Sequence, residues 1–326
     1  MRSQFLKWLK ILLPLLLGVL LMWWIYSKFS PEQIDKIRLH FREANYIYVL
    51  ISIVFAFLSH LSRAYRWNYL LQPMGYTTRF RNNVMAIGIS YIINLLIPRS
   101  GEVSRALIMQ KYENIPFEKA FGTIFAERAI DLIILFLLAV LAFSVQYQTL
   151  KEFVFSRIPL YKLILVFSVL LAIVLLIILY SRTSNSKLSK KIRTFIEGFK
   201  TGILSVLRMK KAGLFILHTV FIWTMYLLMF YITFFAIKET AMLSFPVIIT
   251  SFVVGGLVIA FTNGGFGYYP IFIAQLLLLF DVPYETGTAF GWIAWTSQFI
   301  VVLTFGLSSF ILLPILNKKS QNTWQK

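Results

Sequence analysis

Two interrupted apolar stretches decide the fold of this chain, and the first reads Asn94-Leu-Leu-Ile-Pro-Arg-Ser-Gly-Glu-Val-Ser-Arg105. The second reads Val258-Ile-Ala-Phe-Thr-Asn-Gly-Gly-Phe-Gly-Tyr-Tyr269. The first apolar run stops at Pro98 and restarts after Gly101, whereas the second stops at Thr262 and restarts after Gly267. Unpaired backbone is costly in lipid, so such a break survives only where it lines a cavity or is buried in protein. The two stretches therefore predict two broken membrane helices.

A short matching phrase follows each interrupted stretch. It reads Asn114-Ile-Pro-Phe-Glu118 after the first stretch and Asp281-Val-Pro-Tyr-Glu285 after the second. Paired interruptions by Gly and Pro in two halves of a chain are typical of transporters built from inverted repeats, which bind their substrate between the repeats. We therefore expect an inverted repeat, with one unit at about 46–146 and the other at about 212–315.

The composition places the chain in a membrane. Hydrophobic residues make up 59% of its 326 residues, and the mean hydropathy is +0.75. Soluble domains of this size are less apolar, so soluble enzymes and soluble binding modules are excluded as classes. The chain has no cysteine, which excludes disulfides, thiolate metal sites and cysteine nucleophiles. The net charge of +19 comes from basic residues between apolar runs, which favours lipid headgroups over nucleic acid as partners.

The apolar runs predict an all-α polytopic membrane protein with a single transmembrane domain over residues 1–326. Six runs are long enough for full spans, at about 11–27, 46–70, 117–146, 159–181, 212–237 and 286–315. The two interrupted stretches, at about 82–113 and 240–282, are expected to form re-entrant hairpins.

Basic residues are distributed unevenly among the loops. They are concentrated in the N-terminus, in segment 63–81, in segment 182–211 and in the C-terminal tail. Because cytoplasmic loops are enriched in Lys and Arg, this distribution predicts that both termini lie inside. The first hairpin would then enter from the cytoplasm and the second from outside. Segment 182–211 is expected to be a cytoplasmic linker with a basic amphipathic helix on the inner leaflet.

Ionisable side chains are expected at membrane depth around the first interrupted stretch. They are Arg99, Glu102 and Arg105 in that stretch, and Glu127, Arg128 and Asp131 in the following span. Each charge near the centre of a membrane helix costs roughly 2.5–3.5 kcal/mol. One interpretation is a polar cavity in which arginines bind phosphate while carboxylates orient the arginines or recognise an amine. The alternative is that these charges pair with one another and only hold helices together.

Backbone groups at the two breaks are further candidates for this cavity. A half-helix that begins near Ser100 would point its N–H groups and its positive dipole end at the cavity. The glycines of the second break would allow a similar nest of backbone N–H groups. The residues that complete the candidate binding site are Asn94, Gly101, Asn263, Gly264, Gly265 and Gly267.

Other polar residues in the spans are interpreted as structural. Arg63, Arg66 and Trp67 are expected to anchor the end of the second span at the membrane interface. His60 and His218 are expected to be packed and hydrogen-bonded rather than to relay protons. No residue is assigned to catalysis, and neither a cofactor nor a metal ion is expected.

The combined motifs resemble a known membrane family. The motifs Asn94-Leu-Leu-Ile-Pro-Arg-Ser-Gly-Glu-x-x-Arg105, Glu127-Arg-x-x-Asp131 and Asn263-Gly-Gly-Phe-Gly267 look like the transmembrane domain of lysylphosphatidylglycerol synthases. The motif Arg63-Ala-x-Arg-Trp67 also fits the second span of that domain. Stand-alone members form a flippase-like integral-membrane family. The resemblance covers nearly the whole chain.

The resemblance implies lipid translocation. In two-domain relatives, the multiple peptide resistance factors, this domain is associated with moving aminoacylated phospholipid to the outer leaflet, whereas a separate cytoplasmic domain makes that lipid. No such cytoplasmic domain fits in this sequence, so synthase activity is not expected. The headgroup cavity implied by the resemblance consists of Arg99, Glu102, Arg105, Glu127, Arg128 and Asp131. The chain departs from many relatives at Tyr268-Tyr269-Pro270, where they have an Arg-Glu pair, so its second half lacks that charge pair.

The expected function is that of a flippase or transporter in a bacterial-type cytoplasmic (inner) membrane. Candidate ligands are an anionic or aminoacylated phospholipid and a polyprenyl-phosphate lipid, and nucleic acid is not expected. Two alternatives remain open: a non-catalytic partner of a lipid-modifying enzyme, and a membrane-embedded enzyme that acts on lipid-linked phosphate or sugar. A homodimer is a further candidate assembly.

Overall fold

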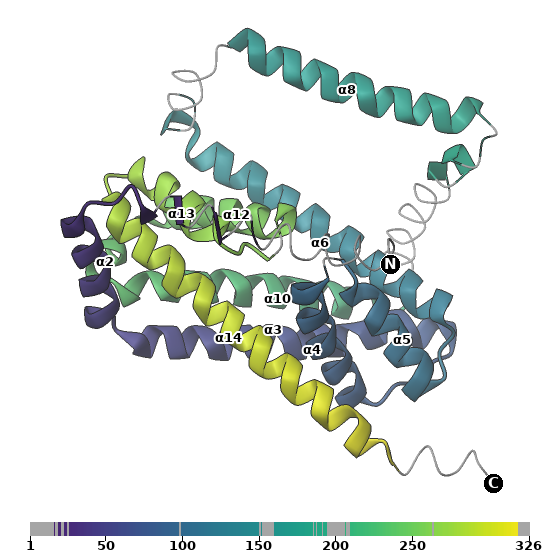
Figure 1. Cartoon of the computed structure of the whole chain (residues 1–326). Helices are drawn as coiled ribbons and strands as arrows, with labels where there is room; N and C mark the ends of the chain where they lie inside the picture. Colours follow the sequence, from purple (N-terminus) through teal and green to yellow (C-terminus); the bar gives the residue numbers. More distant parts are fainter. Residues whose placement is uncertain are drawn as a thin grey trace, which may run out of the picture. The chain divides into compact units, whose positions relative to one another are not determined.

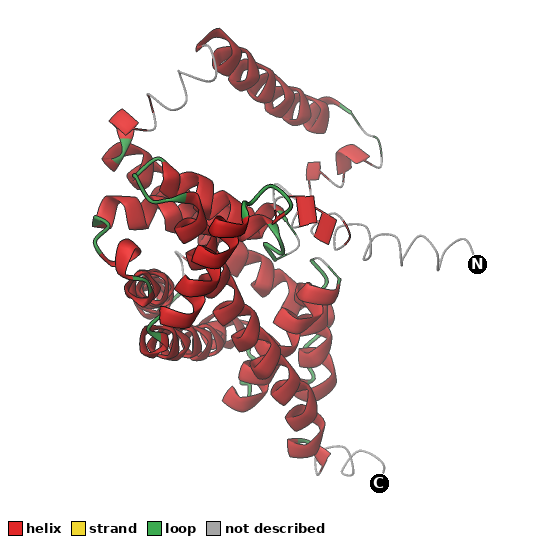
Figure 2. Cartoon of the chain, turned by 60° about the vertical axis from the view of Figure 1, so that its left-hand side comes forward, coloured by secondary structure: helices red, strands yellow, loops and turns green. Residues whose placement is uncertain are grey.

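The computed structural model describes residues 26–97, 99–149, 160–184, 209–262 and 264–318 continuously. It also describes isolated residues at 16, 19, 20, 23, 24, 151, 186, 188–190, 192, 193 and 206. All regular elements in this part of the chain are helices, so the expected all-α fold is confirmed (Figure 2). The chain divides into two compact units, one formed by residues 1–124 and 211–326 and the other by residues 125–210.

The helices follow one order in both halves of the chain: long, short, short, long. In the first half they are α3 (Tyr46–Leu71), α4 (Phe80–Leu96), α5 (Gly101–Glu113) and α6 (Phe117–Val145). In the second half they are α10 (Ala212–Thr233), α12 (Phe245–Phe261), α13 (Tyr268–Leu278) and α14 (Tyr284–Leu316). The smaller elements are α2 (Pro31–Glu43), η1 (Gln72–Met74), η2 (Phe234–Ala236) and α11 (Lys238–Ala241), and the second unit contains α8 (Leu160–Thr183).

Four helices of the described part are long and apolar enough to cross a membrane. They are Tyr46–Met74, Phe117–Val145, Ala212–Ala236 and Tyr284–Leu316, and they match four of the six expected spans. The expected span at 159–181 coincides with α8, and most of the expected span at 11–27 lies outside the described residues. The chain is therefore a polytopic helical membrane protein, while six spans, the N-in and C-in orientation and the repeat units at 46–146 and 212–315 stay predictions.

Helices α3 and α10 lie side by side in opposite directions (Figure 1). Near one end of the pair, the Asn45 backbone N–H donates to the Ala236 carbonyl oxygen at 2.8 Å. Near the other end, Lys211 Nζ donates to Gln72 Oε1 at 3.3 Å. Of the shorter helices, α4 contacts α3 and α12 contacts α10.

Helix α14 packs on α13 along its N-terminal half. A Cβ on Gly287 would lie 2.9 Å from Ala274 Cα, and a Cβ on Gly291 would lie 2.6 Å from Pro270 Cα. Close backbone approach through small residues four apart is a common way for membrane helices to associate, because lipid provides no hydrophobic drive between them. Pro270, early in α13, lies at Gly291, whereas Ala274, later in α13, lies at Gly287. Helix α13 therefore runs from the middle of α14 toward its N-terminal end.

Helix α4 packs on the C-terminal half of α14 in a similar way. A Cβ on Gly306 would lie 2.7 Å from Ile92 Cβ and 3.0 Å from the Gly88 carbonyl oxygen. A Cβ on Gly88 would lie 2.9 Å from the Phe305 carbonyl oxygen. Beyond this contact, Asn317 Nδ2 donates to Asn82 Oδ1 at 2.9 Å. Thus α4 runs from the C-terminal end of α14 toward its middle.

A polar cluster closes the C-terminal end of α14. Buried Asn82 donates to both Glu113 Oε1 at the end of α5 and Asn317 Oδ1 at the end of α14. Asn317 Nδ2 also donates to the Leu313 carbonyl oxygen at 2.9 Å, and Arg79 Nη1 donates to Asn317 Oδ1 at 3.4 Å. The cluster fixes the start of α4 and the end of α5 to one end of α14.

Helix α2 begins where the sequence places it, with Ser30 as the N-cap and Pro31 in the first turn. Ser30 Oγ accepts from the Gln33 backbone N–H at 3.2 Å, and Gln33 Oε1 accepts from the Ser30 N–H at 3.0 Å. This reciprocal capping box satisfies two backbone donors that the helix itself cannot satisfy. The buried face of α2 carries Ile37, which is 2% exposed.

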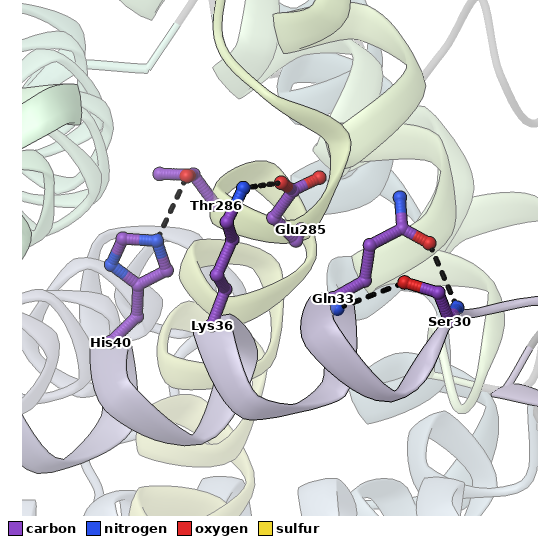
Figure 3. A network of polar contacts seen from close by, with 6 residues as sticks. All are labelled: Ser30, Gln33, Lys36, His40, Glu285 and Thr286. Atoms are coloured by element: carbon purple, nitrogen blue, oxygen red, sulfur yellow. Dashed lines mark hydrogen bonds and ion pairs between the residues drawn. The ribbon is translucent and has the colours of Figure 1, made fainter.

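Polar contacts hold α2 on the N-terminal end of α14 (Figure 3). Lys36 Nζ lies 3.3 Å from Glu285 Oε1, and His40 Nε2 lies 2.9 Å from Thr286 Oγ1. His40 Nδ1 also lies 3.8 Å from Glu239 Oε2. The two ends of α14 are therefore both tied to other helices through polar side chains.

The matching phrases after the two short helices adopt the same local backbone. Asn114 and Asp281 both have left-handed backbone conformations, with φ of 54° and 61°. Each is followed by a buried aliphatic residue, Ile115 in one phrase and Val282 in the other, and then by a proline at the start of the next long helix. The likeness of the two phrases in sequence is thus also a likeness in local structure.

Candidate functional site

The first break lies between the last residue of α4, Leu96, and the first residue of α5, Gly101. Arg99 adopts a left-handed conformation with φ of 61°, which is uncommon for a residue with a side chain. Asn94 Oδ1 accepts from the Gly101 backbone N–H at 2.7 Å, so this side chain from α4 caps α5 across the break. Asn94 therefore satisfies one of the orphan donors at the start of α5.

Gly101 is required at this position by close packing. A Cβ there would collide with the Ser90 carbonyl oxygen and would lie 2.6 Å from Asn94 Nδ2. The N-terminus of α5 is therefore pressed against the last two turns of α4. The break is a specific, tightly packed structure rather than a loose loop.

The second break lies between α12 and α13. Gly264, Gly265 and Gly267 have positive φ of 65°, 78° and 74°, which residues with side chains rarely adopt. The Gly265 backbone N–H donates to Thr262 Oγ1 at 3.0 Å, and Trp295 Nε1 donates to the Gly264 carbonyl oxygen at 2.8 Å. A hydroxyl and an indole thus satisfy two polar backbone groups of this irregular segment.

The two breaks lie against each other. A Cβ on Gly264 would lie 3.3 Å from Leu95 Cδ2, which belongs to the last turn of α4. At 1.5 Å per residue, α14 is about 50 Å long. Trp295, which donates a hydrogen bond to the second break, lies about 17 Å from the start of α14. Gly306, which contacts α4 just before the first break, lies about 33 Å along it. The two broken helices thus approach from opposite ends of α14, and their breaks come together along its middle third.

Buried arginines lie beside the first break. Arg105 of α5 is 2% exposed, and its guanidinium carbon lies 3.7 Å from the ring centroid of Trp67 on α3. Trp67 Nε1 in turn donates to Thr123 Oγ1 at 2.9 Å, at the start of α6. A guanidinium stacked on an indole keeps its plane fixed, with its N–H groups directed along the edge of the stack. This chain of contacts orients Arg105.

Two more arginines are buried on the same face of α3. Arg66 is fully buried, and its Nη1 donates to Thr219 Oγ1 of α10 at 2.8 Å. Arg63 is 3% exposed, with its guanidinium carbon 6.0 Å from the Tyr226 ring centroid. The prediction that Arg63, Arg66 and Trp67 anchor α3 at the membrane interface is therefore wrong. They lie inside the packed helices because α10, Arg105 of α5 and Thr123 at the start of α6 contact this part of α3. The two arginines therefore cannot count as cytoplasmic loop charges.

The two histidines are packed as expected. His60 is buried, with its ring stacked on Phe305 at 5.6 Å between centroids and 4.8 Å from the Tyr91 ring. His218 Nδ1 lies 2.8 Å from Ser62 Oγ. Both histidines join α3 to neighbouring helices through rings or hydrogen bonds.

The carboxylates of the candidate site belong to two different units. Glu102 of α5 is half-buried, and its Oε2 accepts from Asn94 Nδ2 at 3.4 Å. In the second unit, Glu127 is fully buried and Asp131 is 7% exposed. Arg128 Nη1 lies 3.9 Å from Asp131 Oδ2, one turn along α6. Whether these three residues of α6 share a site with the residues at the breaks stays a prediction.

The structure thus brings part of the candidate set together. Asn94, Gly101 and Glu102 form one contact cluster at the first break, and Gly264 packs against that break. Arg99 is exposed, whereas Arg105 is buried one turn into α5. Asn263 and Pro98 lie outside the described residues. Within the described residues, no group of three His, Cys, Asp or Glu side chains could hold a metal ion.

Sequence reasoning missed the role of α3 in this region. The signal was present, since Arg63, Arg66 and Trp67 recur at helical spacing on one face of a helix that is otherwise apolar. Nothing in the sequence predicts the contacts with Thr219 and Thr123, because they depend on which helices pack against α3.

A comparison of the sequence with known protein families identifies a matching family. The family described as the transmembrane region of lysylphosphatidylglycerol synthase matches residues 11–306. The chain belongs to this family. It is an integral membrane protein, and the resemblance stated from the sequence motifs is confirmed.

Similar proteins are UPF0104 membrane proteins of archaea. One from Methanocaldococcus jannaschii is 28% identical over 146 residues, which cover 43% of this chain and 44% of the relative. One from Pyrococcus horikoshii is 27% identical over 141 residues, covering 42% of this chain and 40% of the relative. One from Methanothermobacter thermautotrophicus is 23% identical over 215 residues, covering 59% of this chain and 64% of the relative. The chain thus matches less than two thirds of each relative's length. No solved structure matches the chain.

Proposed function

We propose that the chain is a lipid transporter that moves a phosphate-containing headgroup between the two leaflets of a cytoplasmic membrane. The observation that carries this proposal is the contact between the two helix breaks, where Gly264 packs on Leu95 beside the middle of α14. Membership of a family named for a lipid synthase's membrane region supports a lipid-related role.

The opposed approach of the two broken helices supports an inverted repeat of re-entrant hairpins. Backbone that is not helical is tolerated at membrane depth where it lines a cavity or is buried in protein. In secondary transporters such breaks lie near the midplane and line the substrate site, and the repeats rock about that site. The long-short-short-long helix order and the shared backbone of the Asn114 and Asp281 turns are consistent with two related units.

Polar groups near the first break suit a headgroup with a phosphate. Arg105 and Arg66 are held in fixed orientations by Trp67 and Thr219, and guanidinium groups bind phosphate oxygens through two parallel hydrogen bonds. In this conformation the buried arginines are closed off from solvent, as the site of an alternating-access carrier is in its occluded state. Acyl chains would stay in the bilayer while the headgroup passes between the breaks.

Proteoliposomes test this function directly. The purified full-length chain is reconstituted with headgroup-labelled lipids on one leaflet, and movement is followed by the loss of accessibility to an impermeant quencher. Mass spectrometry of the same lipids then tests for chemical change. Movement with unchanged lipid mass supports transport, whereas a chemically altered lipid supports the enzyme alternative. No movement of any lipid by correctly inserted protein would overturn the proposal.

A further inference from the structure

A cavity lies at the N-terminal end of α14, apart from the two breaks. Its volume is about 330 Å³, and its described lining residues are Trp24, Lys28, Phe29, Gln33, Gln275 and Tyr284. They come from the segment before α2, from α2, from α13 and from the first turn of α14. Trp295, which donates to the second break, lies about 17 Å further along α14. The cavity is therefore separate from the site proposed for transport.

Aromatic rings form much of the wall of this cavity. Phe29 stacks on Tyr284 with 5.6 Å between ring centroids, which joins the segment before α2 to the start of α14. Lys28 Nζ lies 3.6 Å from the centroid of the Trp24 ring, four residues earlier in the chain. The electron-rich face of an indole attracts a cation, so this contact holds the ammonium at the cavity.

The polar groups at the cavity favour a ligand with several hydrogen-bond acceptors. The Lys28 ammonium has three donors and no acceptor. Gln33 Oε1 already accepts from the Ser30 backbone N–H at 3.0 Å (Figure 3), so this side chain offers a ligand its amide N–H groups. Gln275 supplies a second carboxamide. None of the described lining residues is acidic, so these residues together carry one positive charge.

The surroundings of the cavity favour a lipid over a soluble ligand. Phe272 and Leu278 lie one turn before and one turn after Gln275 on α13, and they are 45% and 52% exposed. Phe272 lies on the side of Gln275 toward the middle of α14, a helix long and apolar enough to cross a membrane. Trp and Tyr are enriched where such helices meet the lipid headgroups. A headgroup in the cavity would thus place its acyl chains beside an exposed apolar face of α13.

We infer that this cavity binds the phosphate of a membrane phospholipid, as a second lipid site distinct from the two breaks. A phosphodiester has one negative charge, which matches the single lysine, and its oxygens accept from ammonium and amide donors. The recognised group is the phosphate, which anionic, zwitterionic and aminoacylated phospholipids share. The inference does not depend on transport, because the lipid would bind the segment before α2, α13 and α14 whatever passes between the breaks.

Photo-cross-linking of the full-length protein tests this site. The purified chain in detergent is incubated, below saturation, with phosphatidylglycerol that has a diazirine near its headgroup, and labelled peptides are identified by mass spectrometry after irradiation. We expect labels on the peptides that contain residues 24–33 and 275–284.

Variants of two lining residues identify the groups that bind the probe. Lys28→Gln and Gln275→Leu should each reduce this labelling about fivefold, and both should fold because these side chains are exposed. Lys238→Gln is the matched control, since Lys238 is an exposed lysine of α11 that does not line the cavity, and it should be labelled as wild type is. Equal labelling of wild type and both cavity variants would overturn the site.

Unlabelled competitors identify the class of ligand. Phosphatidylglycerol and phosphatidylethanolamine should both displace the probe, whereas diacylglycerol with the same acyl chains should not, because it lacks the phosphate. Displacement by diacylglycerol at the same concentration would overturn recognition of the phosphate. If free glycerol phosphate displaces the probe as effectively as phosphatidylglycerol does, the ligand is a soluble phosphate and the lipid assignment is wrong.

Discussion

Leu95 and Gly264 are in contact although they belong to different broken helices, and a Cβ on Gly264 would lie 3.3 Å from Leu95 Cδ2. The contact joins the end of α4 to the turn between α12 and α13. Both segments lie along the middle third of α14, far from the polar clusters at its two ends. A membrane protein that brings two irregular backbone segments together in this way must satisfy their polar groups locally, and the structure shows Asn94, Thr262 and Trp295 doing so.

Gly101→Ala should destabilise the first break, because the new methyl group would collide with the Ser90 carbonyl oxygen and with Asn94. Overpacking of this kind costs about 1–3 kcal/mol. We expect a lower midpoint of thermal unfolding in detergent. The matched control is Gly122→Ala on α6, where a Cβ meets nothing within 4 Å, and it should not lower the midpoint. Equal midpoints for the two variants would contradict the tight packing of the break.

Trp295→Phe should weaken the second break while it keeps most of the aromatic packing. The change removes the indole N–H that donates to the Gly264 carbonyl oxygen at 2.8 Å, and a partly buried acceptor left unsatisfied costs about 1 kcal/mol. The midpoint of thermal unfolding and the rate of lipid movement should both fall. Trp292→Phe is the control, since Trp292 contacts Trp295 edge-on at 5.8 Å between ring centroids and should have the smaller effect. The reverse order would refute the role of Trp295.

Arg105→Lys should impair the protein although it keeps the positive charge. Lysine has no planar guanidinium to place over the Trp67 ring, and a desolvated contact of this type contributes about 2 kcal/mol. We expect slower lipid movement and a lower unfolding midpoint. Arg38→Lys, at a side chain that is 70% exposed, should change stability by less than about 0.5 kcal/mol. Full activity of the Arg105 variant would show that charge alone is sufficient at this position.

The attachment of α2 to α14 should depend on packing more than on its ion pair. Lys36→Met removes a contact between a lysine side chain that is 62% exposed and the Glu285 side chain, which is 12% exposed, and a pair with one partner in solvent contributes about 1 kcal/mol. Ile37→Ala removes a side chain that is 2% exposed, at a cost of about 2–5 kcal/mol. The free energy of unfolding of the two variants is compared at low and high salt, and Ile37→Ala should lower it more than Lys36→Met does. A larger, salt-sensitive loss for Lys36 would reverse this assignment.

The sequence predicted the breaks well because their causes are local. Gly101, Gly264, Gly265 and Gly267 mark positions where a side chain would clash or where φ is positive, and these constraints are visible as residue types. The N-cap of α2 was predictable for the same reason, since Ser30 and Pro31 act within one turn.

The roles of other residues depended on tertiary packing and could not be predicted. Asn94 was assigned to the candidate cavity from its residue type and place, and the structure shows that it caps α5 across the break. Arg66 and Trp67 were assigned to the membrane interface because they lie near the end of an apolar run, but α10 and α6 supply the threonines that bind them inside. The same limit applies to the meeting of the breaks, which depends on where α4 and α13 pack along α14.

The measurement that tests the central claim most directly is a cross-link between the two breaks. The chain has no native cysteine, so Leu95→Cys with Gly264→Cys provides the two thiols, and each single variant and the reduced double variant serve as controls. If the headgroup passes between the breaks, oxidation should join the two cysteines and stop lipid movement, and reduction should restore the rate of the reduced double variant. Lipid movement that continues at the same rate after complete cross-linking would contradict the account.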